Sequence, residues 1–147
     1  MNPAIGLAVL ATAVIAYGLA DRAPRPGDDY DMAARSQMAW HQAAATAAAA
    51  AGLTTGQVAP ASVAPPHFYV GVEQWTTYVV NGAAVTVQPA GSPRSPLALA
   101  EALAEASSGD YGAGMVRGGW FYSATLGQMF PVPGVPGPAA AYASVLQ

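Results

Sequence analysis

The chain opens with an almost unbroken apolar run, and the spacing of apolar residues then changes several times along its length. Residues 4–20 read AIGLAVLATAVIAYGLA and contain no charged side chain. As an α-helix this run would be roughly 26 Å long, close to the ~30 Å hydrocarbon core of a bilayer. Asp21 and Arg22 end it. The pattern predicts a transmembrane anchor over residues 1–22.

Two other interpretations of the apolar run stay open. The small residues of Gly18-Leu19-Ala20 are compatible with cleavage of a secretory signal peptide before Asp21, although the basic segment typical of such peptides is absent. The run is also compatible with a buried helix of a globular domain. We expect a retained anchor.

Small residues recur at every fourth position of the apolar run and would form one row on a helix. They are Ala4, Ala8, Thr12, Ala16 and Ala20. A row of this kind lets another helix approach closely, and close packing is what pairs helices in lipid. An alanine-rich span also produces such rows by composition alone. We take the row as a candidate helix-packing face for self-association or for a partner helix.

A second helix is predicted from about residue 30 to residue 51, after the Pro/Gly break APRPGDD. Asp28 or Asp29 would cap its start and Gly52 would follow its end. The side chains expected to pack, besides alanines, are Met32, Met38 and Trp40, and those expected in solvent are Arg35, Gln37, His41 and Gln42. Residues 53–66, rich in Pro, Ala and Ser, are predicted to be a linker.

After the linker, the residue pattern becomes typical of β-strands. Residues 68–80 and 83–88 are rich in β-branched and aromatic side chains, and Asn81-Gly82 between them is the strongest local signal for a hairpin. A third helix is predicted from Ser95, its N-cap, and Pro96, its first residue, to the stop at residues 107–109.

A second hairpin is predicted to turn at Gly118-Gly119, and residues 139–146 can return as a last strand. The predicted fold class is α+β, an N-terminal transmembrane helix followed by a small domain with antiparallel hairpins and packed helices. Its parts are the anchor (1–22), a helix and linker (23–66) and the α+β domain (67–147).

Composition excludes several function classes. Only 9% of the residues are charged, the net charge is −3, and the five basic residues are scattered arginines. A nucleic-acid-binding protein needs a clustered basic face, so we expect no nucleic-acid partner. The absence of cysteine removes disulfides, thiolate catalysis and cysteine-bound metal.

Candidate catalytic residues are few. His41 has no second histidine or carboxylate four residues away, and His67 follows two prolines, so both are expected to be structural. Glu101 and Glu105 share the predicted wet side of the third helix. No Gly-x-Ser-x-Gly motif is present. We predict no catalytic, cofactor-binding or metal-binding residue, and therefore no enzyme.

The aromatic residues suggest a contact surface. Trp120, Phe121 and Tyr122 are consecutive in a predicted strand, where neighbouring side chains point to opposite faces. Packing between sheet and helices explains most of the aromatic residues. At least one of these three must nevertheless face away from the core, and the three together are our candidate contact surface.

The whole chain resembles the PilM family of conjugative thin-pilus (type IVb) systems in size and order of segments. The local pieces that carry the resemblance are the hairpin from Trp75 to Gly82, the stretch from Met115 to Trp120, and residues 126–133 leading into the Pro/Gly tail. The resemblance implies an inner-membrane component of a pilus assembly, with its domain in the periplasm. Arg22 and Arg25, by contrast, favour a cytoplasmic domain.

The leading functional hypothesis is a non-enzymatic, membrane-anchored component of a pilus assembly apparatus that acts through contacts with other pilus-machinery proteins. The alternative is a pilin-like subunit that polymerises through its apolar N-terminal helix, although the basic leader and early glutamate of pilins are absent. A small envelope hydrolase is a third hypothesis, for which the sequence shows no nucleophile and base arrangement.

Overall fold

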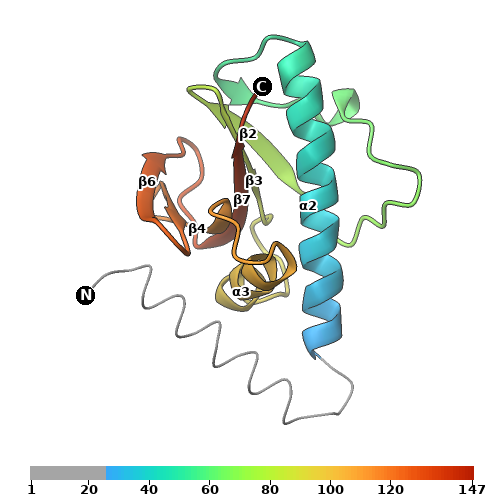
Figure 1. The fold of residues 1–147 in the computed structure, drawn as a ribbon, viewed down its shortest axis with the longest axis vertical. Helices are drawn as coiled ribbons and strands as arrows, with labels where there is room; N and C mark the ends of the chain where they lie inside the picture. The colour runs from blue at the N-terminus through green and yellow to red at the C-terminus, as the bar shows by residue number, and fades with distance from the viewer. Residues whose placement is uncertain (1–25) are drawn as a thin grey trace.

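The computed structural model describes residues 26–147, and within them the strands form a single antiparallel sheet (Figure 1). In chain order the elements are α2 (Pro26–Ala50), β1 (Gly56–Gln57), the 3-10 turn η1 (Pro60–Ser62), β2 (Thr76–Val80), β3 (Ala83–Val87), α3 (Pro96–Ala106), β4 (Ala113–Arg117), β5 (Trp120–Ser123), β6 (Gly127–Pro131) and β7 (Ala139–Val145). The sheet order is β1-β2-β3-β7-β4-β5-β6. The last strand, β7, thus lies between β3 and β4 and joins the two hairpins.

The predicted fold class needs correction. Within residues 26–147, a curved sheet of seven antiparallel strands carries two helices, instead of separate hairpins behind a transmembrane helix. No helix in this part of the chain has the length and apolar character needed to cross a bilayer. The predicted anchor, residues 1–22, and the candidate row Ala4, Ala8, Thr12, Ala16 and Ala20 lie outside the described residues.

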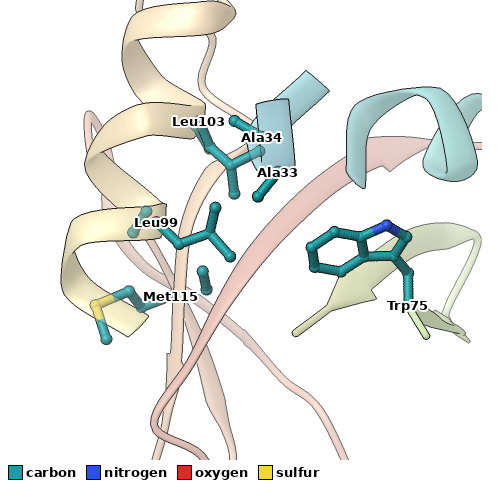
Figure 2. Close-up of a cluster of buried hydrophobic side chains, with 9 residues drawn as sticks. Ala33, Ala34, Trp75, Leu99, Leu103 and Met115 are labelled. Carbon is teal, nitrogen blue, oxygen red and sulfur yellow. The ribbon is translucent and has the colours of Figure 1, made fainter. Parts of the chain in front are cut away.

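Both helices pack on the same face of the sheet. Leu99 and Leu103 of α3 point toward Ala33 and Ala34 of α2, and the Trp75 indole lies beside them (Figure 2). All five of these residues are buried. The alanines matter because a small side chain lets α2 approach α3 and the sheet closely, so a helix rich in alanine can still form a dense core.

The other face of the sheet forms a second core without a helix. Val85, Val116 and Phe121 are fully buried there. The segment after β6 returns beneath the strands and contributes Val132 and Val135 to the same cluster. Curvature of the sheet and this returning segment together exclude water from a face that a flat sheet would expose.

Two local predictions, the Asn81-Gly82 turn and the Ser95 cap, are confirmed. Asn81 and Gly82 have φ values of 48° and 80° and connect β2 to β3, as the hairpin requires. The Ser95 side chain accepts a hydrogen bond from the Ala98 amide at the start of α3, where Pro96 is the first helical residue.

Other boundaries differ from the prediction. α2 begins at Pro26, so the predicted capping residues Asp28 and Asp29 lie within its first turn. Proline is well suited to a first helical position because its missing N–H would have no partner there. Strand β2 starts only at Thr76, and β1 and β6 were not predicted. β1 pairs with β2 and α2 packs on β3 and β7, so residues 26–66 share one core with residues 67–147.

Candidate functional site

The predicted contact surface on β5 is divided by the sheet. Phe121 is fully buried and stacks on Phe130, so it cannot take part in a surface contact. Trp120 is 37% exposed, and Tyr122 is half-buried with the Arg117 guanidinium 5.0 Å from its ring centre. Of the three predicted residues, Trp120 remains as the main exposed aromatic group.

Charged residues are unevenly distributed along the chain, and their absence marks a second surface. Residues 36–72 and residues 118–147 contain no Asp, Glu, Lys or Arg. The first of these stretches contains most of α2 and the whole connection from α2 to the approach of β2, and the second ends in β7. The two uncharged stretches therefore lie together where the later part of α2, its following segment and the end of β7 meet (Figure 1).

A shallow groove follows α2 at this place. Its floor is the outward side of α2, one wall is the segment that leads toward β2, and the other is the end of β7. The lining residues are Ala39, His41, Gln42, Ala43, Ala45, Thr46, Ala49, Ala64, Pro66, Phe68, Ser144, Val145, Leu146 and Gln147. A second hollow adjoins it toward the start of α2 and shares Ala39 and Phe68 with it.

Large apolar side chains stand exposed beside these hollows. Phe68 is 75% exposed, Val70 60% and Met32 52%, and all three line one or both hollows. Met32 was predicted to pack inside, and Phe68 was predicted to lie in a strand; neither prediction is correct. We call the groove together with these three side chains the α2 groove. An apolar, uncharged cluster of this kind is characteristic of a contact surface.

A buried polar network lies beneath the α2 groove. His41 and Gln37, both predicted to face solvent, are 1% and 0% exposed. The Gln37 amide donates hydrogen bonds to the Thr86 and Ala140 carbonyl oxygens, at 2.8 and 3.2 Å. His41 Nδ1 lies 2.8 Å from the Thr86 hydroxyl, and His41 Nε2 lies 2.7 Å from the Ser144 hydroxyl. The network holds α2 to β3 and β7.

Ser144 and His41 are the residue types of a nucleophile and its base, and the sequence did not indicate that they lie in contact. Ser144 is exposed and lines the α2 groove. The third position, however, is occupied by Thr86, whose neutral hydroxyl cannot stabilise an imidazolium as a carboxylate does. Burial lowers the pKa of His41 to about 4, and only the more distant Asp110 opposes this shift. His41 is therefore a poor general base near neutral pH, and the geometry fits a structural role better than catalysis.

The remaining ionisable candidates, Glu101 and His67, lie in different surroundings. Glu101, predicted to lie on a wet side, is buried, and burial raises the pKa of its carboxyl group. His67 is exposed beside Phe68. Within residues 26–147, no three His, Asp or Glu side chains gather in a way that could hold a metal ion.

Arg94 links the segment before α3 to the first turn of α2 and to the segment before β2. Its guanidinium donates two hydrogen bonds to the Asp29 carboxylate, at 2.8 and 2.9 Å, and one to Glu73 at 2.9 Å. The Glu73 side chain is only 5% exposed. The charge of Arg94 compensates this buried carboxylate, and the ion pairs raise the pKa of Arg94 further.

Comparison with known proteins gives no match: no family model, no curated protein and no solved structure is similar to this chain.

Proposed function

We propose that this chain is a non-enzymatic component of a pilus assembly apparatus and that it acts through protein–protein contacts. The observation that carries the contact role is the α2 groove, where Met32, Phe68 and Val70 expose large apolar side chains beside α2. Exposing these groups to water is unfavourable, and a partner that covers them gains their burial energy.

The pilus assignment is supported by the resemblance of the chain to the PilM family. The resemblance also implies that the domain works on the periplasmic side and that its partners are other proteins of the pilus machinery. A pilin-like subunit is the competing function, because a long helix packed on an antiparallel sheet is also the arrangement of type IV pilins. The absence of catalysis is supported by the poor basicity expected of His41.

The test is to place one charge in the α2 groove of the full-length protein. Ala43 lines the groove floor, and Ala43→Arg would force a guanidinium into any apolar contact there. We expect loss of partner complexes and of pilus assembly, with normal protein levels. Gln128→Arg, at an exposed position on β6, is the matched control. Wild-type assembly with Ala43→Arg would overturn the contact role.

Fractionation separates the proposed function from the competing one. A component of the assembly apparatus stays with the cells when filaments are sheared, whereas a polymerising subunit is recovered in the sheared filaments. Recovery of the chain as a major constituent of filaments would therefore replace our proposal with the pilin-like function.

A further inference from the structure

The second hollow of the α2 groove presents an acidic and a basic side chain on one exposed side of α2. Asp31 and Arg35 line this hollow, and their side chains are 54% and 67% exposed. Arg35 Nε donates a hydrogen bond to Asp31 Oδ2 at 3.0 Å. The other carboxylate oxygen and the two terminal guanidinium nitrogens make no hydrogen bond to another residue between 26 and 147. Both side chains therefore keep polar atoms for a charged partner.

The apolar side chains beside this ion pair belong to a segment that is fixed alongside α2. Phe68 and Val70 line the same hollow, and most of each side chain is exposed. The Ser36 hydroxyl donates a hydrogen bond to the Val70 carbonyl oxygen at 2.7 Å, and the ring of Tyr69 lies 5.9 Å from the ring of Trp40. The segment is thus held on α2 while two of its large side chains face outward, which lowers the entropic cost of binding a partner.

The mixture of charged and apolar groups restricts what can occupy the second hollow. A purely apolar occupant would remove water from the ion pair without supplying new polar contacts. An occupant that carries opposite charges in register would form ion pairs as it covers the apolar side chains. A second copy of this chain supplies those charges by symmetry, because a twofold interface places residue i opposite residue j and residue j opposite residue i.

We infer that two copies of this chain associate through the second hollow, with their α2 helices antiparallel. The Asp31 carboxylate of each copy then pairs with the Arg35 guanidinium of the other, and Met32, Phe68 and Val70 of both copies are covered. The inference deepens the proposed function, because it names the occupant of one part of the α2 groove and rests on the contact role of that groove. The net charge of −3 is small, so repulsion between copies is weak.

Charge reversal in the full chain tests this arrangement. Arg35→Asp makes acidic groups of one copy face acidic groups of the other, and Asp31→Arg does the same with basic groups. We expect each variant to raise the Kd of self-association at least about tenfold. Sedimentation equilibrium over a concentration series, in one detergent throughout, measures the Kd. Residues 1–25 are identical in all the proteins compared, so any contribution from them is the same in each.

An equimolar mixture of the two variants separates contacts between copies from the ion pair within one copy. In the mixture neither copy has an internal acid–base pair, but the acidic groups of one copy face the basic groups of the other. We therefore expect heterodimers with a Kd close to that of the wild type. Arg117→Asp is the matched control, because it reverses an exposed arginine on β4, changes the net charge as Arg35→Asp does, and should leave the Kd unchanged.

Three results would overturn the inference. A wild type that stays monomeric over the whole concentration series would show that the copies do not associate. Single reversals that leave the Kd unchanged would place the contact between copies on another surface. A mixture of the two variants that forms no heterodimer would show that Asp31 and Arg35 do not pair between copies.

The proposed function fails by a different result, because Ala43 lines the groove outside the second hollow. If charge reversal has the expected effects but Ala43→Arg leaves pilus complexes intact, the second hollow binds another copy and the contact role in the pilus is wrong. If Ala43→Arg abolishes those complexes and charge reversal has no effect on self-association, only the second copy is wrong.

Discussion

On the face of the sheet that α2 covers, β3 and β7 present Ala84, Thr86 and Ala140, whereas on the opposite face the same strands present Val85 and Ala141. On the face that α2 covers, the side chains of these strands are small, and directed hydrogen bonds hold α2 in place. On the opposite face, the strands themselves and the segment after β6 supply the apolar side chains of the core, among them Phe121 and Val116. Alternation along each strand thus gives one sheet two different kinds of core.

The difference teaches how a helix rich in alanine can be held in one position. Apolar burial is not directional, so alanines alone would let α2 slide or rotate on the sheet. Hydrogen bonds from Gln37 and His41 to groups on β3 and β7 fix its register. On the opposite face, no helix has to be positioned, and the shape and volume of the branched and aromatic side chains determine how they fit.

The largest expected effect comes from emptying the apolar core. Phe121→Ala removes a fully buried ring and should lower the free energy of unfolding by about 4 kcal/mol. Trp120→Ala, one residue away and on the other face, should cost roughly 1 kcal/mol because Trp120 is already 37% exposed. Urea denaturation of both variants measures their free energies of unfolding. Equal losses of stability would contradict the placement of Phe121 in the core and of Trp120 on the other face of β5.

On the helix face, the buried charge of Glu73 gives the next effect. Arg94→Met leaves that carboxylate without its compensating guanidinium and should cost about 3 kcal/mol. Asp29→Asn removes only the exposed half of the cluster, since the Asp29 side chain is 53% exposed, and should cost under about 1 kcal/mol. Thermal unfolding at neutral pH compares them. A larger loss in Asp29→Asn would show that Glu73 does not depend on Arg94.

The polar network predicts a pH dependence of stability. Burial lowers the pKa of folded His41 from 6.5 to about 4, so the unfolded chain binds more protons between these values. The contribution of neutral His41 to the free energy of unfolding is therefore fully present above pH 6.5. It falls by about 2–3 kcal/mol as the pH is lowered toward 4. Glu101, whose pKa is raised, acts in the opposite direction.

The contribution of His41 is isolated by comparison with a variant. Denaturation of wild type and His41→Gln from pH 7 to pH 4 should give curves that converge as the pH falls. His67→Gln, at an exposed position, serves as the control and should follow the wild type. A constant difference between wild type and His41→Gln would show that His41 does not titrate as its burial implies.

The smallest effects should separate the two ends of the Thr86, His41 and Ser144 chain. Thr86→Val removes a buried hydroxyl that also contacts Thr77 at 2.7 Å, and should cost about 1–2 kcal/mol. Ser144→Ala, at an exposed end, should cost less than about 1 kcal/mol, because water can replace the hydroxyl.

A fluorophosphonate probe should leave Ser144 unlabelled. Labelling of wild type but not of Ser144→Ala would make Ser144 a nucleophile.

Local sequence signals were sufficient for the hairpin turn and the helix cap. Asn81-Gly82 and Ser95-Pro96 determine φ values and hydrogen bonds among residues at most three positions apart, so nearby side chains decide the outcome. Residues 139–146 were also expected to return as a last strand, and β7 covers Ala139–Val145. Local signals could not show that β7 inserts between β3 and β4, because strand order depends on pairing across long stretches of chain.

The candidate site was largely hidden from the sequence. Gln37 and His41 are polar residues on a helix, and only partners 45 to 103 positions away make their burial favourable. Gly56 was assigned to a linker, yet it pairs with Val79 in β1 and has a φ of 126°. Phe68 looked like a strand residue because aromatic content favours strands, and nothing local indicated that it would stand exposed beside α2.

The sequence by itself determined where the chain turns, where α3 begins, and that long stretches carry no charge. These properties depend on residue type and near neighbours alone. Only the tertiary structure decided which uncharged stretches meet, which polar side chains are buried, and that α2 keeps an open apolar side. Burial and contact depend on the packing of distant segments, and in this chain that packing turns alanines, two buried polar residues and an exposed phenylalanine into a groove.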